Sequence, residues 1–327
     1  MRATDYYNKY NIKTKQKMKR LFVAVAAFAL AAGIASAQDF NAAVETFNNG
    51  AQTLESNKAD ALTQFKSALA QFEACTEDEA ADMVAQCKKI IPQTILSIAK
   101  EQINEANYDE ALETLKEAAA VAEGYGIEEI AADAKDLVPT AYTRKGAALL
   151  KAKDFAGAAA AFKAAVSLNP EDGQNQLLYG QALMQAGDNA GAIAALEAAA
   201  ANGKAEQAGK LLANAFLKEG MSLVKAGKSA EAIEALEKSN SYVESANAFK
   251  LIASANTKLG KSKAAIEAYK KYLEVDPNAK DAADVMFTIA ATAQKAGDKA
   301  TATEYYKKLS GTKYAEQAKA QLAVLAK

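Results

Sequence analysis

The stretch "KDFAGAAAAFKAAVSLNP" at residues 153–170 decides the fold. It is dominated by alanine, places Phe162 among the alanines and ends at Pro170. Alanine has the highest intrinsic helix propensity but contributes little buried area, and proline does not continue a helix. The stretch therefore predicts a helix whose small side chains let neighbouring helices approach closely, beside a larger residue that fills the remaining space.

The same pattern recurs seven times along the chain. Each copy has a small residue, a large apolar residue four positions later and a third position three residues beyond that. Spacings of four and three place all three positions on one face of a helix. The small residues are Ala61, Ala111, Ala158, Ala192, Ala232, Ala265 and Ala302. The large ones are Phe65, Leu115, Phe162, Leu196, Leu236, Tyr269 and Tyr306, and the third positions are Ala68, Ala118, Ala165, Ala199, Ser239, Tyr272 and Leu309.

A second helical run precedes each copy, and it has a small residue twelve positions before the alanine. These residues are Asn49, Ala99, Gly146, Gly180, Gly220, Ala253 and Ala290. In four copies a glycine stands between the two runs, where a left-handed residue can end the first helix. These glycines are Gly187, Gly227, Gly260 and Gly297. Pro170 and Pro277 follow the second run of two copies, so each repeat is predicted to be helix, short turn, helix.

The first two repeats are longer than the others. Successive alanines lie 50 and 47 residues apart at the start of the chain, and 34, 40, 33 and 37 residues apart afterwards. Pro92 and Pro139 occupy matching positions in the longer repeats. Because proline interrupts the hydrogen-bond ladder of a helix, we predict extended or kinked first helices in this third of the chain.

Together these residues resemble the tetratricopeptide repeat family, whose repeats are 34 residues long. The family's usual tryptophan in the first helix is absent, and Tyr142 or Gln176 stands in its place. The resemblance implies an all-α fold, a right-handed superhelical array of antiparallel helix pairs (an α-solenoid). Each pair leaves an apolar face that only stacking against its neighbours can bury.

This reading divides the chain into four parts. Residues 1–37 form an upstream extension and a leader, and residues 38–138 form N-terminal repeats with extended helices. The resemblance is closest over 139–310, which we predict to be the main array. The apolar pattern of residues 311–327 predicts a capping helix over the last repeat.

The leader predicts export. Two basic residues follow Met18, an apolar segment spans residues 21–34, and Ala35-Ser36-Ala37 has the pattern of a signal-peptide cleavage site. An apolar segment of 14 residues is shorter than the roughly 20 that cross a bilayer. We predict that translation starts at Met18, that cleavage follows Ala37, and that the mature chain is periplasmic. Secretion from the cell is the alternative.

Composition argues against several classes of function. The chain has no histidine, the commonest general base and metal ligand in proteins. It also has no glycine-rich phosphate loop with a lysine and no cluster of metal ligands. Residues 38–327 carry 32 basic and 39 acidic groups, which is unlike the basic surface of a nucleic-acid binder. We predict a non-catalytic protein without cofactor, metal or nucleic-acid partner.

Cys75 and Cys87 are the only cysteines, and export permits a disulfide between them. If the chain turns near residues 76–78, the helical rise offsets the two by about 10 Å, which is beyond disulfide reach. A loop that unwinds around Cys75 would close that gap. The sequence leaves the pairing open.

The family resemblance implies that the first helices line a concave face that holds a peptide or helix of a protein partner. Carrying those positions onto this chain gives a set of partner-binding candidates rich in basic and amide side chains. Such side chains suit an acidic segment or a terminal carboxylate. The candidates are Arg144, Gln181, Asn214, Lys218, Asn247 and Lys250.

The sequence thus predicts a protein–protein interaction scaffold of the bacterial cell envelope. Two alternatives stay open at this point. The chain could be a structural protein that associates with itself as a homo-oligomer, or an accessory subunit of an envelope enzyme or transport complex.

Overall fold

The computed structural model of the protein describes residues 36–326, which form α-helices joined by short turns and contain no β-strand. The upstream extension and most of the predicted signal peptide lie outside these residues. No helix within residues 36–326 has both the length and the hydropathy needed to cross a membrane.

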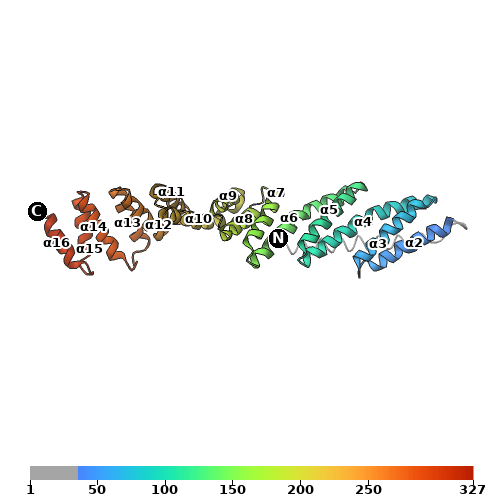
Figure 1. The fold of residues 1–327 in the computed structure, drawn as a ribbon, viewed down its shortest axis with the longest axis horizontal. Helices are drawn as coiled ribbons and strands as arrows, with labels where there is room; N and C mark the ends of the chain where they lie inside the picture. Colours follow the sequence, from blue (N-terminus) through green and yellow to red (C-terminus); the bar gives the residue numbers. More distant parts are fainter. Residues whose placement is uncertain (1–35, 327) are drawn as a thin grey trace. The chain divides into compact units, whose positions relative to one another are not determined.

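Within each compact unit the helices follow one another as antiparallel pairs that correspond to the sequence repeats (Figure 1). We call the first helix of a pair its A helix and the second its B helix. The A helices are α2 (Ser36–Thr53), α4 (Asp78–Asn104), α6 (Glu128–Lys151), α8 (Gly173–Ala186), α10 (Ala205–Lys225), α12 (Ala246–Lys258) and α14 (Ala282–Lys295). The B helices are α3 (Lys58–Ala74), α5 (Tyr108–Gly124), α7 (Phe155–Leu168), α9 (Asn189–Ala199), α11 (Ser229–Tyr242), α13 (Ser262–Val275) and α15 (Lys299–Lys308).

A last helix, α16 (Ala315–Leu325), packs on α15 and buries Ala318. The chain divides into two compact units between Lys145 and Gly146. The N-terminal unit contains α2 to α5 and most of α6, and the C-terminal unit runs from the end of α6 to α16. The domain boundaries placed at 138 and 310 stay predictions.

The repeated face of the B helices is the core of the structure. All seven repeated alanines are fully buried, and the residues seven positions after them are buried. The large apolar residues between them are buried in six repeats, while Tyr269 is half-buried in the sixth. The core therefore follows the spacing of four and three that the sequence shows.

A small A-helix residue faces a large B-helix residue in each of the following pairs. A Cβ atom built at Gly180 would lie 2.6 Å from Leu196 Cγ, and one at Gly220 would lie 2.5 Å from Leu236 Cγ. The backbone of the A helix therefore contacts the large side chain directly. A side chain at either glycine would clash with that leucine.

The first repeat corrects the predicted position of this small residue. Asn49 is exposed, whereas Gly50 is buried, and a Cβ atom there would lie 3.0 Å from the Phe65 ring. The other six turns between A and B helices contain a left-handed residue, while the turn after α2 has none. The different turn geometry shifts the helix register by one residue.

Four of those left-handed residues are the glycines that the sequence predicted, with φ between 72° and 89°. In repeats 2 and 3 the same position holds Ala106 at φ 66° and Lys153 at φ 62°. After Lys153, the amide of Asp154 donates to the carbonyl of Leu149 at 2.9 Å, the closing hydrogen bond of a Schellman motif. The turn geometry is therefore kept in repeats 2 and 3 at the cost of backbone strain.

Replacing Lys153 with glycine should relieve this strain. We expect the free energy of unfolding to rise by about 0.5–1 kcal/mol, because the left-handed penalty exceeds the entropy cost of glycine. Thermal unfolding followed by circular dichroism should show a higher midpoint. Lys153→Ala is the matched control, since it removes the amine but keeps the strained Cβ atom. An equal gain from Lys153→Ala would contradict the explanation.

The two internal prolines lie within unbroken helices. Pro92 is in α4, which has 27 residues, and Pro139 is in α6, which has 24. The A helices of the N-terminal third are thus extended, and this accounts for the longer intervals there.

The residue that replaces the family's tryptophan in repeat 4 is a polar link between repeats. Gln176 is buried, donates from Nε2 to the carbonyl of Pro170 at 2.6 Å and accepts from Asn202 Nδ2 at 2.9 Å. Asn202 lies in the tight turn between α9 and α10. Hydrogen bonds here replace the apolar contact that a tryptophan would make.

Cys75 and Cys87 are free thiols in the structure. Cys87 is buried in α4, and its burial raises the pKa of its thiol to about 12. Cys75 caps the end of α3, and its thiol donates to the carbonyl of Gln71 at 3.3 Å. Neither thiol is activated for reaction, because the raised pKa values keep both protonated at neutral pH.

Candidate functional site

Three A helices of the C-terminal unit contact one another in succession. Helix α10 touches both α8, which precedes it in the series, and α12, which follows it. Side chains on the exposed side of these three helices therefore belong to one surface. We call it the A-helix surface.

A row of exposed polar side chains runs along α10. Asn214, Lys218 and Ser222 are four residues apart, so they lie one above the other on the helix, and all three are exposed. On α8, Gln181 and Met184 are separated by one turn and are half-buried. The fold leaves the α10 row free for contacts with another molecule.

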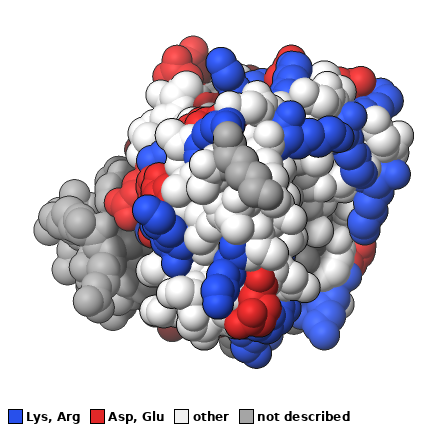
Figure 2. All heavy atoms as spheres, turned by 90° about the vertical axis from the view of Figure 1, so that its left-hand side faces the viewer, with Lys and Arg blue, Asp and Glu red and all other residues white. Residues whose placement is uncertain are grey.

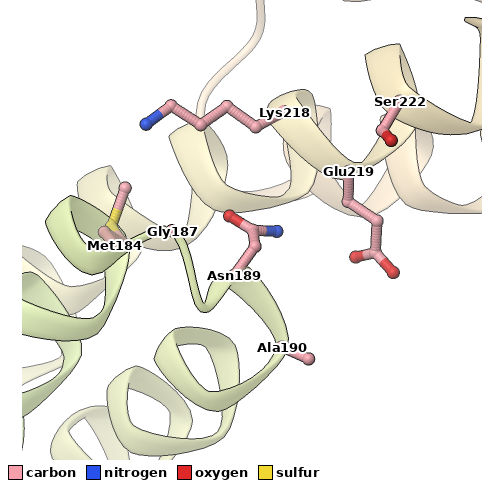
Figure 3. A pocket seen from close by; sticks show the side chains of 7 residues that line it. All are labelled: Met184, Gly187, Asn189, Ala190, Lys218, Glu219 and Ser222. Carbon is pink, nitrogen blue, oxygen red and sulfur yellow. The ribbon is translucent and has the colours of Figure 1, made fainter.

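A shallow pocket of about 390 Å³ lies where α10 passes the turn between α8 and α9 (Figure 3). Its lining combines apolar, amide, charged and hydroxyl groups from three consecutive helices. The lining residues are Met184, Gly187, Asn189, Ala190, Lys218, Glu219 and Ser222. Asn189 also donates from Nδ2 to the carbonyl of Ala215 at 3.0 Å, which holds the start of α9 against α10.

Opposite charges stand side by side in the pocket. Lys218 and Glu219 leave α10 in different directions, Lys218 extending toward the side of Met184 and Glu219 toward that of Ala190 (Figure 3). No ion pair is formed by either residue within the described part of the chain. The pocket therefore offers one cation, one carboxylate and an amide to a polypeptide that lies across it.

Lys250 behaves differently from Lys218. Its Nζ pairs with Asp281 Oδ2 at 2.5 Å, and the Tyr272 hydroxyl donates to Asp281 Oδ1 at 2.5 Å. The Lys250 ammonium, followed by the Tyr272 hydroxyl, lowers the pKa of Asp281 below its ordinary value. The hydrogen bond between Tyr272 and Asp281 is the main reason why the pKa of Tyr272 is raised to about 12.

This cluster joins consecutive repeats, because Lys250 is on α12, Tyr272 on α13 and Asp281 at the start of α14. Lys250 therefore has a role in holding the fold together, which the sequence did not reveal. Lys250 pairs with Asp281, which lies 31 residues further along the chain, and the repeat spacing does not predict this pairing.

The other two candidates lie apart from the pocket. Arg144 belongs to the N-terminal unit, where its Nη1 donates to Asn104 Oδ1 at 3.2 Å. Asn247 is exposed in the first turn of α12. Of the six predicted residues, Lys218 alone lines the pocket, and sequence reasoning missed Met184, Asn189, Glu219 and Ser222. Ser222 was detectable as the next residue of the row through Asn214 and Lys218.

Groups suited to catalysis are lacking in the same region. Within residues 36–326, no three acidic or cysteine side chains gather where they could hold a metal ion. The hydroxyl and the carboxylate of the pocket, Ser222 and Glu219, are not joined by a hydrogen bond in the described structure.

Residues 143–207 and 217–283 match the sequence model of the tetratricopeptide repeat family. The protein therefore contains tetratricopeptide repeats. The matched segments contain α8, α12 and the part of α10 that carries Lys218 and Ser222, whereas Asn214 lies in the interval between them. Tetratricopeptide repeat proteins bind protein partners on extended surfaces of this kind.

Several solved structures are similar to parts of this chain at low sequence identity. MamA is 22% identical over 54% of this chain and 96% of its own, with a TM-score of 0.33. PilF of Pseudomonas aeruginosa is 15% identical over 72% and 99%, with a TM-score of 0.33. YrrB, described as having an unusual peptide-binding site, is 17% identical over 55% and 89%, with a TM-score of 0.34. No curated protein sequence matches the chain.

Proposed function

We propose that this tetratricopeptide repeat protein is a non-catalytic scaffold of the bacterial cell envelope. It binds an extended or helical segment of a protein partner on the A-helix surface of the C-terminal unit. The observation that carries the proposal is the α10 row beside the pocket, because its three side chains are exposed and Lys218 forms no ion pair within the described residues. The signal-peptide pattern of residues 18–37 supports a location in the envelope.

The chemistry of the surface favours a particular partner segment. Lys218 suits a carboxylate of the partner, and the exposed amides of Asn214 and Asn247 suit main-chain hydrogen bonds. Glu219 places a negative charge beside Lys218, so a segment with an acidic residue followed by a basic or hydroxyl residue would match both. We propose an acidic or mixed-charge segment as the ligand.

Reversing the charge of Lys218 should separate binding from folding. The Lys218→Glu variant of the mature chain should lose the envelope protein that the wild type retains on an affinity column, with affinity at least about tenfold weaker. Its thermal midpoint should be unchanged, because Lys218 makes no ion pair in the described fold. Retention of the same protein at wild-type level would remove the proposal.

Lys250→Glu provides the contrasting variant, with the same change of charge. It should lower the free energy of unfolding by about 1 kcal/mol, because it breaks a partly exposed ion pair and places a carboxylate beside Asp281. Lys163→Glu, on the exposed face of α7, is the control for charge alone and should affect neither property. Export is tested separately, by a mature N-terminus at Gln38 in the periplasmic fraction.

A further inference from the structure

A second charged surface lies along one edge of the C-terminal unit, at the turns between A and B helices. The turns between A and B helices in repeats 5, 6 and 7 carry lysines at recurring positions. We call this set the lysine edge. It consists of Lys225, Lys228, Lys258, Lys261, Lys263, Lys295 and Lys299.

Most of these lysines form no ion pair within the described residues. Lys228 pairs with Glu231 at 3.1 Å, and within the described residues no other member of the lysine edge has an ion pair. Four lysines elsewhere in repeats 6 and 7 do form ion pairs, among them Lys250 with Asp281 and Lys271 with Glu274. Lys and Arg side chains also gather along the right-hand rim of the face seen from the α16 side (Figure 2).

The helix dipole explains only part of the set. Lys225, Lys258 and Lys295 lie in the last turns of A helices, where a cation is stabilising. Lys261 is the N-cap of α13, Lys263 is the second residue of α13, and Lys299 is the first residue of α15. A cation at a helix N-terminus is destabilising, so these three lysines oppose the local electrostatics of the fold.

The complementary charge is present in the same chain. Residues 38–145 contain nine basic and 20 acidic residues, whereas residues 146–327 contain 23 basic and 19 acidic residues. The turn of repeat 2 corresponds to the lysine-bearing turn of repeat 6, but it carries acids. Its Glu105 and Glu110 are exposed and form no ion pair within the described residues, and Glu113 follows one turn later.

We propose that the lysine edge binds the acidic turn of repeat 2 in a second copy of the protein. A contact between two different surfaces of one chain is heterologous, so it links copies head to tail. This contact goes beyond the proposed function, because it uses neither the pocket nor the α10 row. Exposed Leu259, between Lys258 and Lys261, adds an apolar contact at the centre of the edge.

The test is the mass of the mature chain in solution, measured by sedimentation velocity over a range of concentrations. At low salt the mass should rise with concentration above that of one protomer, and about 0.5 M salt should weaken association at least tenfold. Lys261→Glu combined with Lys263→Glu should weaken it at least tenfold at low salt. Lys163→Glu combined with Lys319→Glu has the same charge change away from the edge and should have no effect.

Compensating charge reversals test whether the acidic turn of repeat 2 is the surface that contacts the lysine edge. Adding Glu105→Lys and Glu110→Lys to the doubly reversed chain should restore association, because both sides of the contact then have inverted charge. A monomer at every concentration and low salt would overturn the proposal. So would failure of this compensation, or binding of the lysine edge to anionic phospholipid vesicles without self-association. Binding of the envelope partner in the Lys218 experiment is independent of all these outcomes.

Discussion

Phe162→Ala is expected to lower the free energy of unfolding by about 3–5 kcal/mol. Phe162 is fully buried on α7, and a Cβ atom at Gly146 would lie 2.8 Å from its ring. Its cluster consists largely of alanines, which include Ala158 and Ala192. Alanine side chains have no freedom to move into the space left by a ring, so the cavity should stay open.

Urea unfolding followed by circular dichroism measures this loss. Because each repeat contacts only its neighbours, the loss should also broaden the transition as the damaged repeats unfold first. Leu168→Ala on the same helix is the control, since Leu168 is 54% exposed and should cost less than about 0.5 kcal/mol. Equal effects of the two substitutions would contradict the assigned core.

The second large effect is the coupling between Gly220 and Leu236. Gly220→Ala should cost about 1–3 kcal/mol, because the added Cβ atom would lie 2.5 Å from Leu236 Cγ. Leu236→Ala should cost about 2–5 kcal/mol by creating a cavity. The double variant should cost less than the sum by about 0.5–3 kcal/mol, because the new methyl group enters the space that leucine left.

Gly209→Ala is the matched control on the same helix. A Cβ atom there would meet only the Tyr242 ring, at an ordinary 3.6 Å. Removing the flexibility of glycine should therefore stabilise α10 by about 0.5–1 kcal/mol. A destabilising Gly209→Ala, or strict additivity of Gly220→Ala and Leu236→Ala, would show that close helix approach is not the reason for the small residues.

The sequence predicts the helix pairs well because their determinants are local and repeated. The alanine and the large residue four positions later recur in each repeat, and the glycine turn recurs in four of them, so a chance composition does not produce the pattern. The error at Asn49 arose where the turn changes, since a turn without a left-handed residue moves the register by one. Register depends on turn geometry, which spacing alone does not contain.

The candidate site was predicted less completely because its determinants are not local. The family resemblance placed Lys218 and Lys250 among the candidates on adjacent A helices. Their environments differ because Asp281, from the next repeat, pairs with Lys250, whereas no acid among the described residues pairs with Lys218. The pocket also needs the turn between α8 and α9, whose position relative to α10 follows from packing.

The most direct test of the proposed function is photo-cross-linking in living cells. A photoreactive amino acid at position 214 on the A helix α10 should form an adduct with an envelope protein, identified by mass spectrometry. The same group at Glu234, exposed on the B helix α11 of the same repeat, should form none. Adducts from 234 alone, or equal adducts from both positions, would contradict binding on the A-helix surface.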